Sequence, residues 1–209
     1  MDSDEYRIPA GIGEATLVEK RSRFIASVVP AFDEAAALAH IATIRKKHWD
    51  ASHNVHAYII RNGPVRYSDD GEPQGTSGMP TLGVFQKTGI FNVCCVVTRY
   101  YGGILLGAGG LVRAYSAAAR LALDDAGEAV VRRWRQVLVA CPYPLFEQLR
   151  GAIEGAGGVV ESSDYGVDVV LEALIPEAET RDFLGRVADL GAGRIEPELL
   201  DVVYRAAGT

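Results

Sequence analysis

The residues from Asn92 to Arg99, NVCCVVTR, form an almost uninterrupted run of apolar and β-branched side chains. Such a run is typical of a central strand that is buried on both faces. Cys94 and Cys95 then point to opposite faces, because successive side chains of a strand alternate. Both are expected to pack as small buried hydrophobes and not to act as nucleophiles. The helices expected before and after this strand would pack on its sheet, which predicts an α+β fold.

The elements around this strand support that prediction. Asp33 is expected to be the N-cap of a helix that runs to Trp49, and the run YYGGILLGAGG leads into a long helix that ends at Gly127. The remaining segments are two extended pieces in 15–30, a strand over 54–61, a loop over 68–80 and a short helix in PTLGVFQKTG. The expected order is strand, strand, helix, strand, helix, strand, helix, with at least one crossover.

The second part of the chain repeats none of this pattern. Its expected elements are a strand over 135–141, a helix over 144–155, strands over 159–163 and 167–175, a helix over 177–190 and a strand over 194–204. This β-α-β-β-α-β order is the split arrangement of ferredoxin-like domains. The sequence therefore predicts two domains, residues 1–130 and 131–209, with a boundary near Gly127–Arg133.

Charge is distributed unevenly between the two parts. Residues 1–120 carry 13 Lys and Arg against 11 Asp and Glu, a net charge of +2, while residues 121–209 carry 8 against 16, a net charge of −8. The overall charge of −6 argues against a protein that coats nucleic acid non-specifically, because phosphate binding needs clustered cations. A local basic patch on the first domain is compatible with this balance.

The chain is expected to be a soluble cytoplasmic protein with no membrane segment. Three cysteines without a CxxC pair fit a reducing compartment. The N-terminal MDSDEYRIPA is acidic and has no apolar core, so it does not resemble a signal peptide. The longest apolar runs are too short to cross a bilayer.

The segment from Ser68 to Pro80, SDDGEPQGTSGMP, is polar and contributes little to a core. Its acids Asp69, Asp70 and Glu72, together with His53 and His56, are candidates for metal binding or acid–base chemistry. Their spacing matches no defined metal loop, and GTSGM lacks the GxSxG pattern of a nucleophile elbow. No metal or cofactor is therefore expected, and the acids are expected to cap the next helix or to pair with Arg99 and Arg113.

The glycine-rich segment that follows Tyr100 has two open interpretations. Gly102, Gly103, Gly107, Gly109 and Gly110 precede a helix N-terminus that can receive a phosphate or carboxylate, or they only permit close packing. Positive charge converges on the same region from Lys20, Arg21, Arg23, Arg99 and Arg113. These cations are expected either to form a basic surface for nucleic acid or to be solvated.

The pairing of SDDGEPQGTSGMP with NVCCVVTRYYGGILLGAGGLVRAYSAAAR resembles the YigZ/IMPACT family, and the match extends to RSRF and Ser52-His53. The resemblance implies an N-terminal α/β sandwich like a domain of a small-subunit ribosomal protein and domain four of elongation factor G. It also implies a C-terminal ferredoxin-like domain similar to domain five of that factor. Eukaryotic members regulate translation initiation through protein contacts and carry an extra domain that is absent here.

Three functional hypotheses follow. The first is a non-catalytic, translation-associated regulator whose first domain binds structured RNA, the ribosome or a translation-related protein. The second is a small-molecule hydrolase with His53 as base and Asp69, Asp70 or Glu72 as partners. The third is an adaptor whose acidic second domain binds a protein. The expected binding residues are Arg21, Arg23, His53, Asp70, Glu72, Gly75, Thr76, Ser77, Gly78, Arg99, Tyr100, Gly102, Gly103, Gly107, Gly110 and Arg113.

Overall fold

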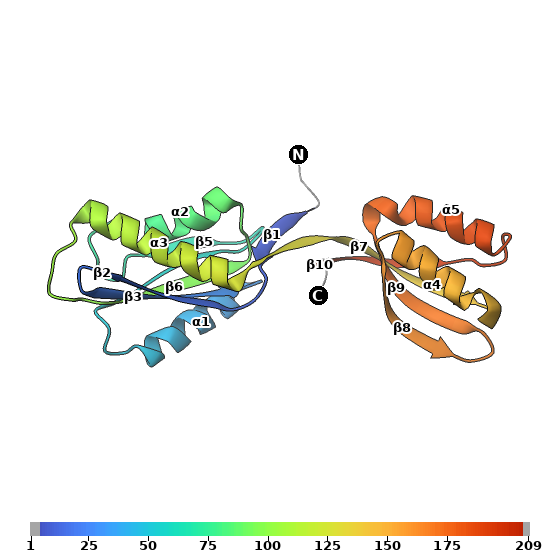
Figure 1. Ribbon diagram of the computed structural model, residues 1–209, viewed down its shortest axis with the longest axis horizontal. Helices are drawn as coiled ribbons and strands as arrows, with labels where there is room; N and C mark the ends of the chain where they lie inside the picture. Colours follow the sequence, from blue (N-terminus) through green and yellow to red (C-terminus); the bar gives the residue numbers. More distant parts are fainter. Residues whose placement is uncertain (1–4, 207–209) are drawn as a thin grey trace. The chain divides into compact units, whose positions relative to one another are not determined.

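The computed structural model describes residues 5–206, which divide into two compact units (Figure 1). The first unit runs from Tyr6 to Val130. The second comprises Glu5 and the described residues from Val131 onward. Each unit has its own sheet covered by helices, so the predicted α+β class is confirmed.

A five-stranded antiparallel sheet forms the centre of the first unit, in the order β2-β3-β6-β4-β5. Its strands are β2 (Gly13–Glu19), β3 (Ser22–Pro30), β4 (His53–Ile59), β5 (Val65–Ser68) and β6 (Val93–Tyr100). The predicted central strand is β6, in which every residue but Tyr100 is buried. Cys94 and Cys95 contact the cores on opposite faces, and burial raises the pKa of the Cys94 thiol to about 12.

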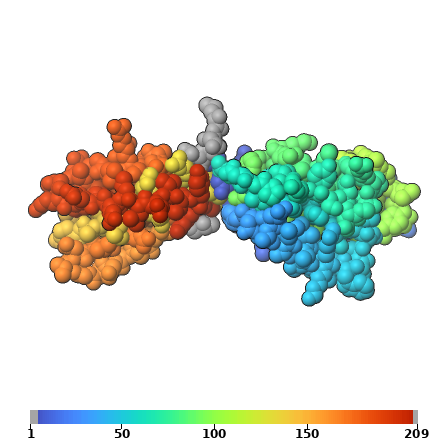
Figure 2. Space-filling model, turned by 180° about the vertical axis from the view of Figure 1, so that it is seen from behind, coloured from blue at the N-terminus to red at the C-terminus, as the bar shows by residue number. Residues whose placement is uncertain are grey.

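Helices cover both faces of this sheet (Figure 1). On one face lies α1 (Glu34–Lys47), while α2 (Gly78–Thr88) and α3 (Ala108–Ala126) lie together on the other. Since β3 and β4 are both antiparallel to β6, they run parallel to each other, and α1 makes the predicted crossover between them. In the view from behind, the blue segment that contains α1 lies on the surface of the unit (Figure 2).

The predicted N-cap of α1 is confirmed, whereas two short strands were not predicted. The Ala36 N–H donates to Asp33 Oδ1 at 2.7 Å, which confirms the N-cap of α1. The helix ends at Lys47, two residues before the expected end at Trp49. Neither β1 (Tyr6–Pro9) nor β5 was predicted from the sequence. The VRYS sequence of β5 alternates apolar and polar side chains, but it is only four residues long and largely exposed, so its periodic signal is too short to stand out.

The second unit has the predicted β-α-β-β-α-β order. Its elements are β7 (Glu128–Cys141), α4 (Phe146–Gly155), β8 (Val159–Tyr165), β9 (Val169–Pro176), α5 (Thr180–Leu190) and β10 (Glu198–Ala206), with the 3-10 turns η1 (Tyr143–Leu145) and η2 (Glu177–Glu179). The strand order β10-β7-β9-β8, antiparallel throughout, is ferredoxin-like. None of the helices in the described residues is long and apolar enough to cross a membrane.

Gly13 shows how closely a helix approaches the sheet of the first unit. A β-carbon added at Gly13 would lie 2.1 Å from the Ala122 carbonyl oxygen and 2.4 Å from the Ala126 amide nitrogen. Both are backbone atoms of α3 and cannot turn away as a flexible side chain can. The position therefore requires glycine so that β2 can pack directly on α3.

We expect Gly13→Ala to lower the free energy of unfolding by about 1–3 kcal/mol, because the added methyl group overpacks this contact. Gly11→Ala is the matched control, since an added β-carbon there meets nothing within 4 Å. Its effect is expected to stay within about 0.5 kcal/mol. Urea unfolding followed by circular dichroism measures both variants. Equal stabilities for the two would contradict the close packing of β2 on α3.

Candidate functional site

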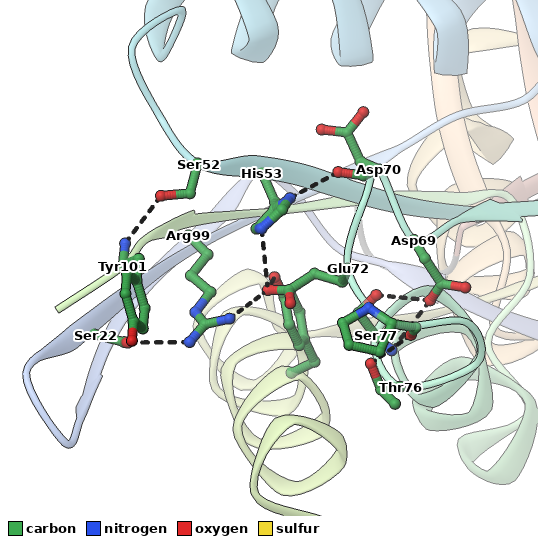
Figure 3. A network of polar contacts seen from close by, with 12 residues as sticks. Ser22, Ser52, His53, Asp69, Asp70, Glu72, Thr76, Ser77, Arg99 and Tyr101 are labelled. Carbon is green, nitrogen blue, oxygen red and sulfur yellow. Dashed lines mark hydrogen bonds and ion pairs between the residues drawn. The ribbon is translucent and has the colours of Figure 1, made fainter. Parts of the chain in front are cut away.

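Asp69 organises the polar loop between β5 and α2. Its Oδ1 accepts hydrogen bonds from Ser77 Oγ at 2.6 Å, the Gly78 N–H at 2.8 Å and the Ser77 N–H at 3.1 Å. Its Oδ2 accepts from the Gly75 N–H at 2.8 Å. Thr76 closes the same turn by donating to the Pro73 carbonyl at 2.6 Å. Asp69 thus caps the start of α2, as expected for one of these acids (Figure 3).

The pKa of Asp69 lies below its usual value. Burial acts in the opposite direction and on its own would raise the pKa. The hydrogen bonds from Ser77, Gly75 and Gly78 favour the carboxylate and together outweigh the effect of burial. Asp69 is consequently ionised in the folded protein, and both of its carboxylate oxygens take part in the cap of α2.

Asp70 ties the same loop to α1 and β4. Its Oδ1 accepts from Arg45 Nη2 at 2.8 Å, and its Oδ2 accepts from the Asn54 N–H at 2.6 Å. Its main-chain carbonyl lies 2.8 Å from His53 Nδ1. Because a carbonyl oxygen can only accept, Nδ1 of His53 carries the proton, and a neutral His53 has its lone pair on Nε2. That Nε2 lies 3.9 Å from Glu72 Oε1.

Glu72 and Arg99 form a buried ion pair at the centre of the site (Figure 3). Arg99 Nη1 donates to Glu72 Oε1 at 2.7 Å, and the two side chains are 6% and 3% exposed, with Arg99 the more exposed. Tyr115 of α3 donates its hydroxyl to the same oxygen at 2.7 Å. Burial, followed by the neighbouring Glu72 charge, raises the pKa of Tyr115, so the phenol stays protonated. The ion pair therefore joins the polar loop to β6 and to α3.

The expectation that Arg99 contacts phosphates from the surface is not supported by its position. Its guanidinium is buried, donates Nη2 to Ser22 Oγ at 3.2 Å, and lies near the rings of Phe24 and Tyr101. Arg99 was placed correctly at a strand end, but its partner lies 27 residues earlier in the chain and no sequence pattern marks it. The pairing with Glu72 agrees with the alternative that acids of the loop bind this arginine.

The glycine-rich segment packs against the β2–β3 hairpin. Ser22 Oγ also accepts from the Gly102 N–H at 3.2 Å, and Ser52 Oγ accepts from the Tyr101 N–H at 3.1 Å. A β-carbon at Gly102 would lie 2.1 Å from the Arg21 carbonyl carbon. Close packing therefore explains Gly102. Gly103 lies in the loop before α3, Gly107 is the N-cap of that helix, and Gly110 belongs to its first turn.

Four of the predicted cations are exposed, three in the β2–β3 hairpin and one in α3. Lys20 and Arg21 occupy the two-residue turn of the hairpin, both with positive φ, and Arg23 and Arg113 are also exposed. The Arg23 guanidinium lies 4.7 Å from the centre of the Tyr100 ring. Tyr100 donates its hydroxyl to Asp50 at 2.9 Å. Within the described residues, none of these four cations forms an ion pair.

The structure does not bring the three acids together around His53. Asp69 caps α2, Asp70 pairs with Arg45, and only Glu72 approaches the histidine through its side chain. No group of three or more His, Cys, Asp and Glu side chains in the described residues is arranged to hold a metal ion. His56 belongs to β4, and burial lowers its pKa.

A pocket of about 460 Å³ lies beside the ion pair, and it was not predicted as such. His53, Glu72 and Arg99 form its polar side. Ser22, Ser52, Tyr101 and Tyr115, which complete the surrounding network, were also missed as site residues. Tyr115 and Ser22 lie inside the motifs VRAYSAAAR and RSRF that carry the family resemblance, so the motifs contained them without revealing their contacts.

Replacing Asp69 tests the cap. We expect Asp69→Ala to cost roughly 0.5–2 kcal/mol of unfolding free energy at pH 7. Since the folded pKa is lowered, the carboxylate stabilises the fold fully above about pH 4 and loses this effect as the pH falls through the folded pKa. The difference between wild type and variant therefore shrinks in acid. Urea unfolding across pH measures it, with the exposed Asp124→Ala as control, and a pH-independent difference contradicts the assignment.

Replacing Arg99 tests the ion pair. We expect Arg99→Met to cost about 3–5 kcal/mol, because it leaves the Glu72 carboxylate buried without a counterion. The double variant Arg99→Met/Glu72→Leu is expected to recover much of that loss, which gives a strong non-additive term. Arg120→Met is the control, since its pair with Asp124 is exposed and contributes under about 1 kcal/mol. If the losses of unfolding free energy in the two single variants add up to the loss in the double variant, the two residues are not coupled.

Comparison with known proteins matches each of the two units to a known domain family. Residues 20–123 match the model of the Impact N-terminal domain, and residues 139–194 match a domain of unknown function, DUF1949. The IMPACT family member YvyE of Bacillus subtilis is 34% identical over 92% of this chain and 89% of its own length. The IMPACT family member YigZ of Escherichia coli is 33% identical over 92% of this chain and 97% of its own length.

A solved structure supports the same assignment. A crystal structure described only as that of a hypothetical protein is 31% identical to this chain, with a TM-score of 0.60. The match covers 94% of this chain and 98% of that one. The similarity to these relatives therefore extends over both units and over most of each relative's length. The chain belongs to the IMPACT family.

Proposed function

We propose that the protein is a translation-associated regulator that binds structured RNA through a cationic surface on the first unit. This cationic surface consists of Lys20, Arg21, Arg23 and Arg113, with the exposed Tyr101 beside them. The observation that carries the proposal is the exposure of these four cations without acidic partners among the described residues. Family membership supports the translation association and a cytoplasmic location.

The geometry of the hairpin supports this surface. A two-residue turn with positive φ at both positions matches the right-handed twist of the flanking strands. Gly102 packs against the backbone of Arg21, so the turn is held from its other side. The β2–β3 turn and the start of α3 lie at the same end of the unit (Figure 1). The turn that carries Lys20 and Arg21 is therefore held in place by its packing against Gly102.

RNA fits this chemistry better than a small substrate does. Arginine and lysine bind phosphates, and an exposed aromatic ring stacks on an unpaired base. Tyr101 is 47% exposed and adjoins Gly102 and Gly103. Since the whole chain has a net charge of −6, RNA binding depends on this local surface and not on the overall charge.

Charge removal tests the proposal. We expect the triple variant Lys20→Gln, Arg23→Gln and Arg113→Gln to weaken binding to a structured RNA. Its slope of log K against log salt is expected to fall by about one unit for each phosphate that the protein no longer neutralises. Fluorescence anisotropy between about 50 and 200 mM salt measures the slope. The control triple Arg150→Gln, Arg181→Gln and Arg186→Gln removes the same charge from the second unit.

Absence of salt-dependent binding in the wild type, or an equal loss of affinity in the two triple variants, would overturn the proposal. Crosslinking in cells identifies the partner class directly. Recovery of a protein through the acidic second unit, with no RNA, would favour the adaptor hypothesis in its place.

A further inference from the structure

The pocket beside the Glu72–Arg99 pair contains none of the four cations proposed to bind RNA. It has a volume of about 460 Å³, which is within the range of small-molecule sites. Its lining includes the polar side chains of His53, Glu72 and Arg99. It also includes the apolar or aromatic side chains of Tyr101, Leu105 and Leu111. Such a lining suits a molecule that has both a polar and an apolar part.

The N-terminus of α3 opens onto this pocket. Gly107 is the N-cap, supplies no side-chain bond, and lines the pocket together with Ala108. The first intrahelical bond runs from the Leu111 N–H to the Gly107 carbonyl at 3.0 Å. The N–H groups of Ala108, Gly109 and Gly110 precede it and have no intrahelical acceptor. The N-terminus of a helix of 19 residues also carries a partial positive charge.

Arg99 provides a second and independent indication. Its side chain is 6% exposed and borders the pocket. Nη1 and Nη2 bind Glu72 and Ser22, but the buried Nε has no hydrogen-bond partner among the described residues. A buried donor without an acceptor is unfavourable, because it has lost its hydrogen bonds to water without replacement. Because Nε itself is closed off from solvent, an anionic oxygen in the pocket would become its acceptor only after a shift of the guanidinium toward the pocket.

The Glu72 carboxylate does not make this pocket unfavourable for an anion. Its Oε1 accepts from both Arg99 and Tyr115 at 2.7 Å. The positive charge of Arg99 compensates the negative charge of Glu72 at close range. The helix N-terminus then adds a further positive contribution on the pocket side.

The apolar side defines the rest of the ligand. Leu105 lines the pocket and is 81% exposed. It stands in a loop bounded by Gly103 and Gly107, and Pro73 lines the same pocket. An apolar or aromatic group in the pocket would cover part of the Leu105 side chain and remove apolar surface from water.

We propose that this pocket binds a small organic anion, with its carboxylate or phosphate at the N-terminus of α3 near Arg99 and its apolar body against Leu105. The site shares Tyr101 with the surface proposed for RNA, but it contains none of the four cations of that surface. Failure of RNA binding would therefore leave this proposal intact, and failure of anion binding would leave the RNA proposal intact.

Nuclear magnetic resonance of the full-length protein tests the site directly. The probes are benzoate, phenyl phosphate and the uncharged benzyl alcohol. We expect at least one anion to shift the backbone amide resonances of Ala108, Gly109 and Gly110 in a saturable manner. Benzyl alcohol is expected to bind at least tenfold more weakly. The comparison of benzoate with phenyl phosphate decides between a carboxylate and a phosphate ligand.

Two variants locate the ligand. Ala108→Pro removes one N–H donor at the first helical position, where proline is well tolerated, and is expected to weaken anion binding about tenfold. Leu105→Ala is expected to weaken binding of the aryl anion severalfold. Leu121→Ala, at an exposed position of α3 outside the pocket, is the matched control and is expected to keep wild-type affinity.

The proposal is overturned if neither anion shifts the three amides of the wild-type protein. It is also overturned if benzyl alcohol binds as tightly as the anions, or if Leu121→Ala weakens binding as much as Leu105→Ala does. The wild-type titration decides the first two outcomes without reference to the stability of any variant.

Discussion

The buried ion pair between Glu72 and Arg99 is the interaction on which the arrangement of the first unit depends. The loop from Asp69 to Ser77 is polar and contributes little to the core, so its position is set by specific anchors. Asp69 fixes it to α2, Asp70 to α1 and β4, and Glu72 to β6 and α3. Each acid thus connects a different element. Loss of one partner would leave the other charge buried without compensation, which is among the costliest changes in a protein interior.

The parts of the fold that were predictable have a local or periodic cause. The Asp33 cap, the buried strand β6 and the order of elements in the second unit each follow from patterns within one segment. The short strand β5 gives too weak a signal, since it is only four residues long and mostly exposed, and it is held by pairing with β4. Asp69 caps α2 from eight residues before Ser77 in the chain, beyond the reach of the N-cap rule.

The candidate site was predicted as a set of residue types, but their contacts were not. The acids of the loop and Arg99 were both identified, and pairing between them was one of two open possibilities. Arg99 is a buried partner and not a surface cation because Phe24 and Tyr101 lie against its guanidinium. The contact with Phe24 joins segments that are distant in sequence, whereas Tyr101 follows Arg99 by two residues. No spacing rule contains that information.

Ser22 connects the two regions for which functions are proposed. Its hydroxyl oxygen accepts from both Arg99 Nη2 and the Gly102 N–H at 3.2 Å. Arg99 borders the pocket, whereas Gly102 packs on the turn that carries Lys20 and Arg21. A ligand that draws the guanidinium of Arg99 toward the pocket acts on the same hydrogen bonds that hold the hairpin. If such a ligand alters RNA affinity, thermodynamic linkage requires RNA to alter the affinity for the ligand by the same factor.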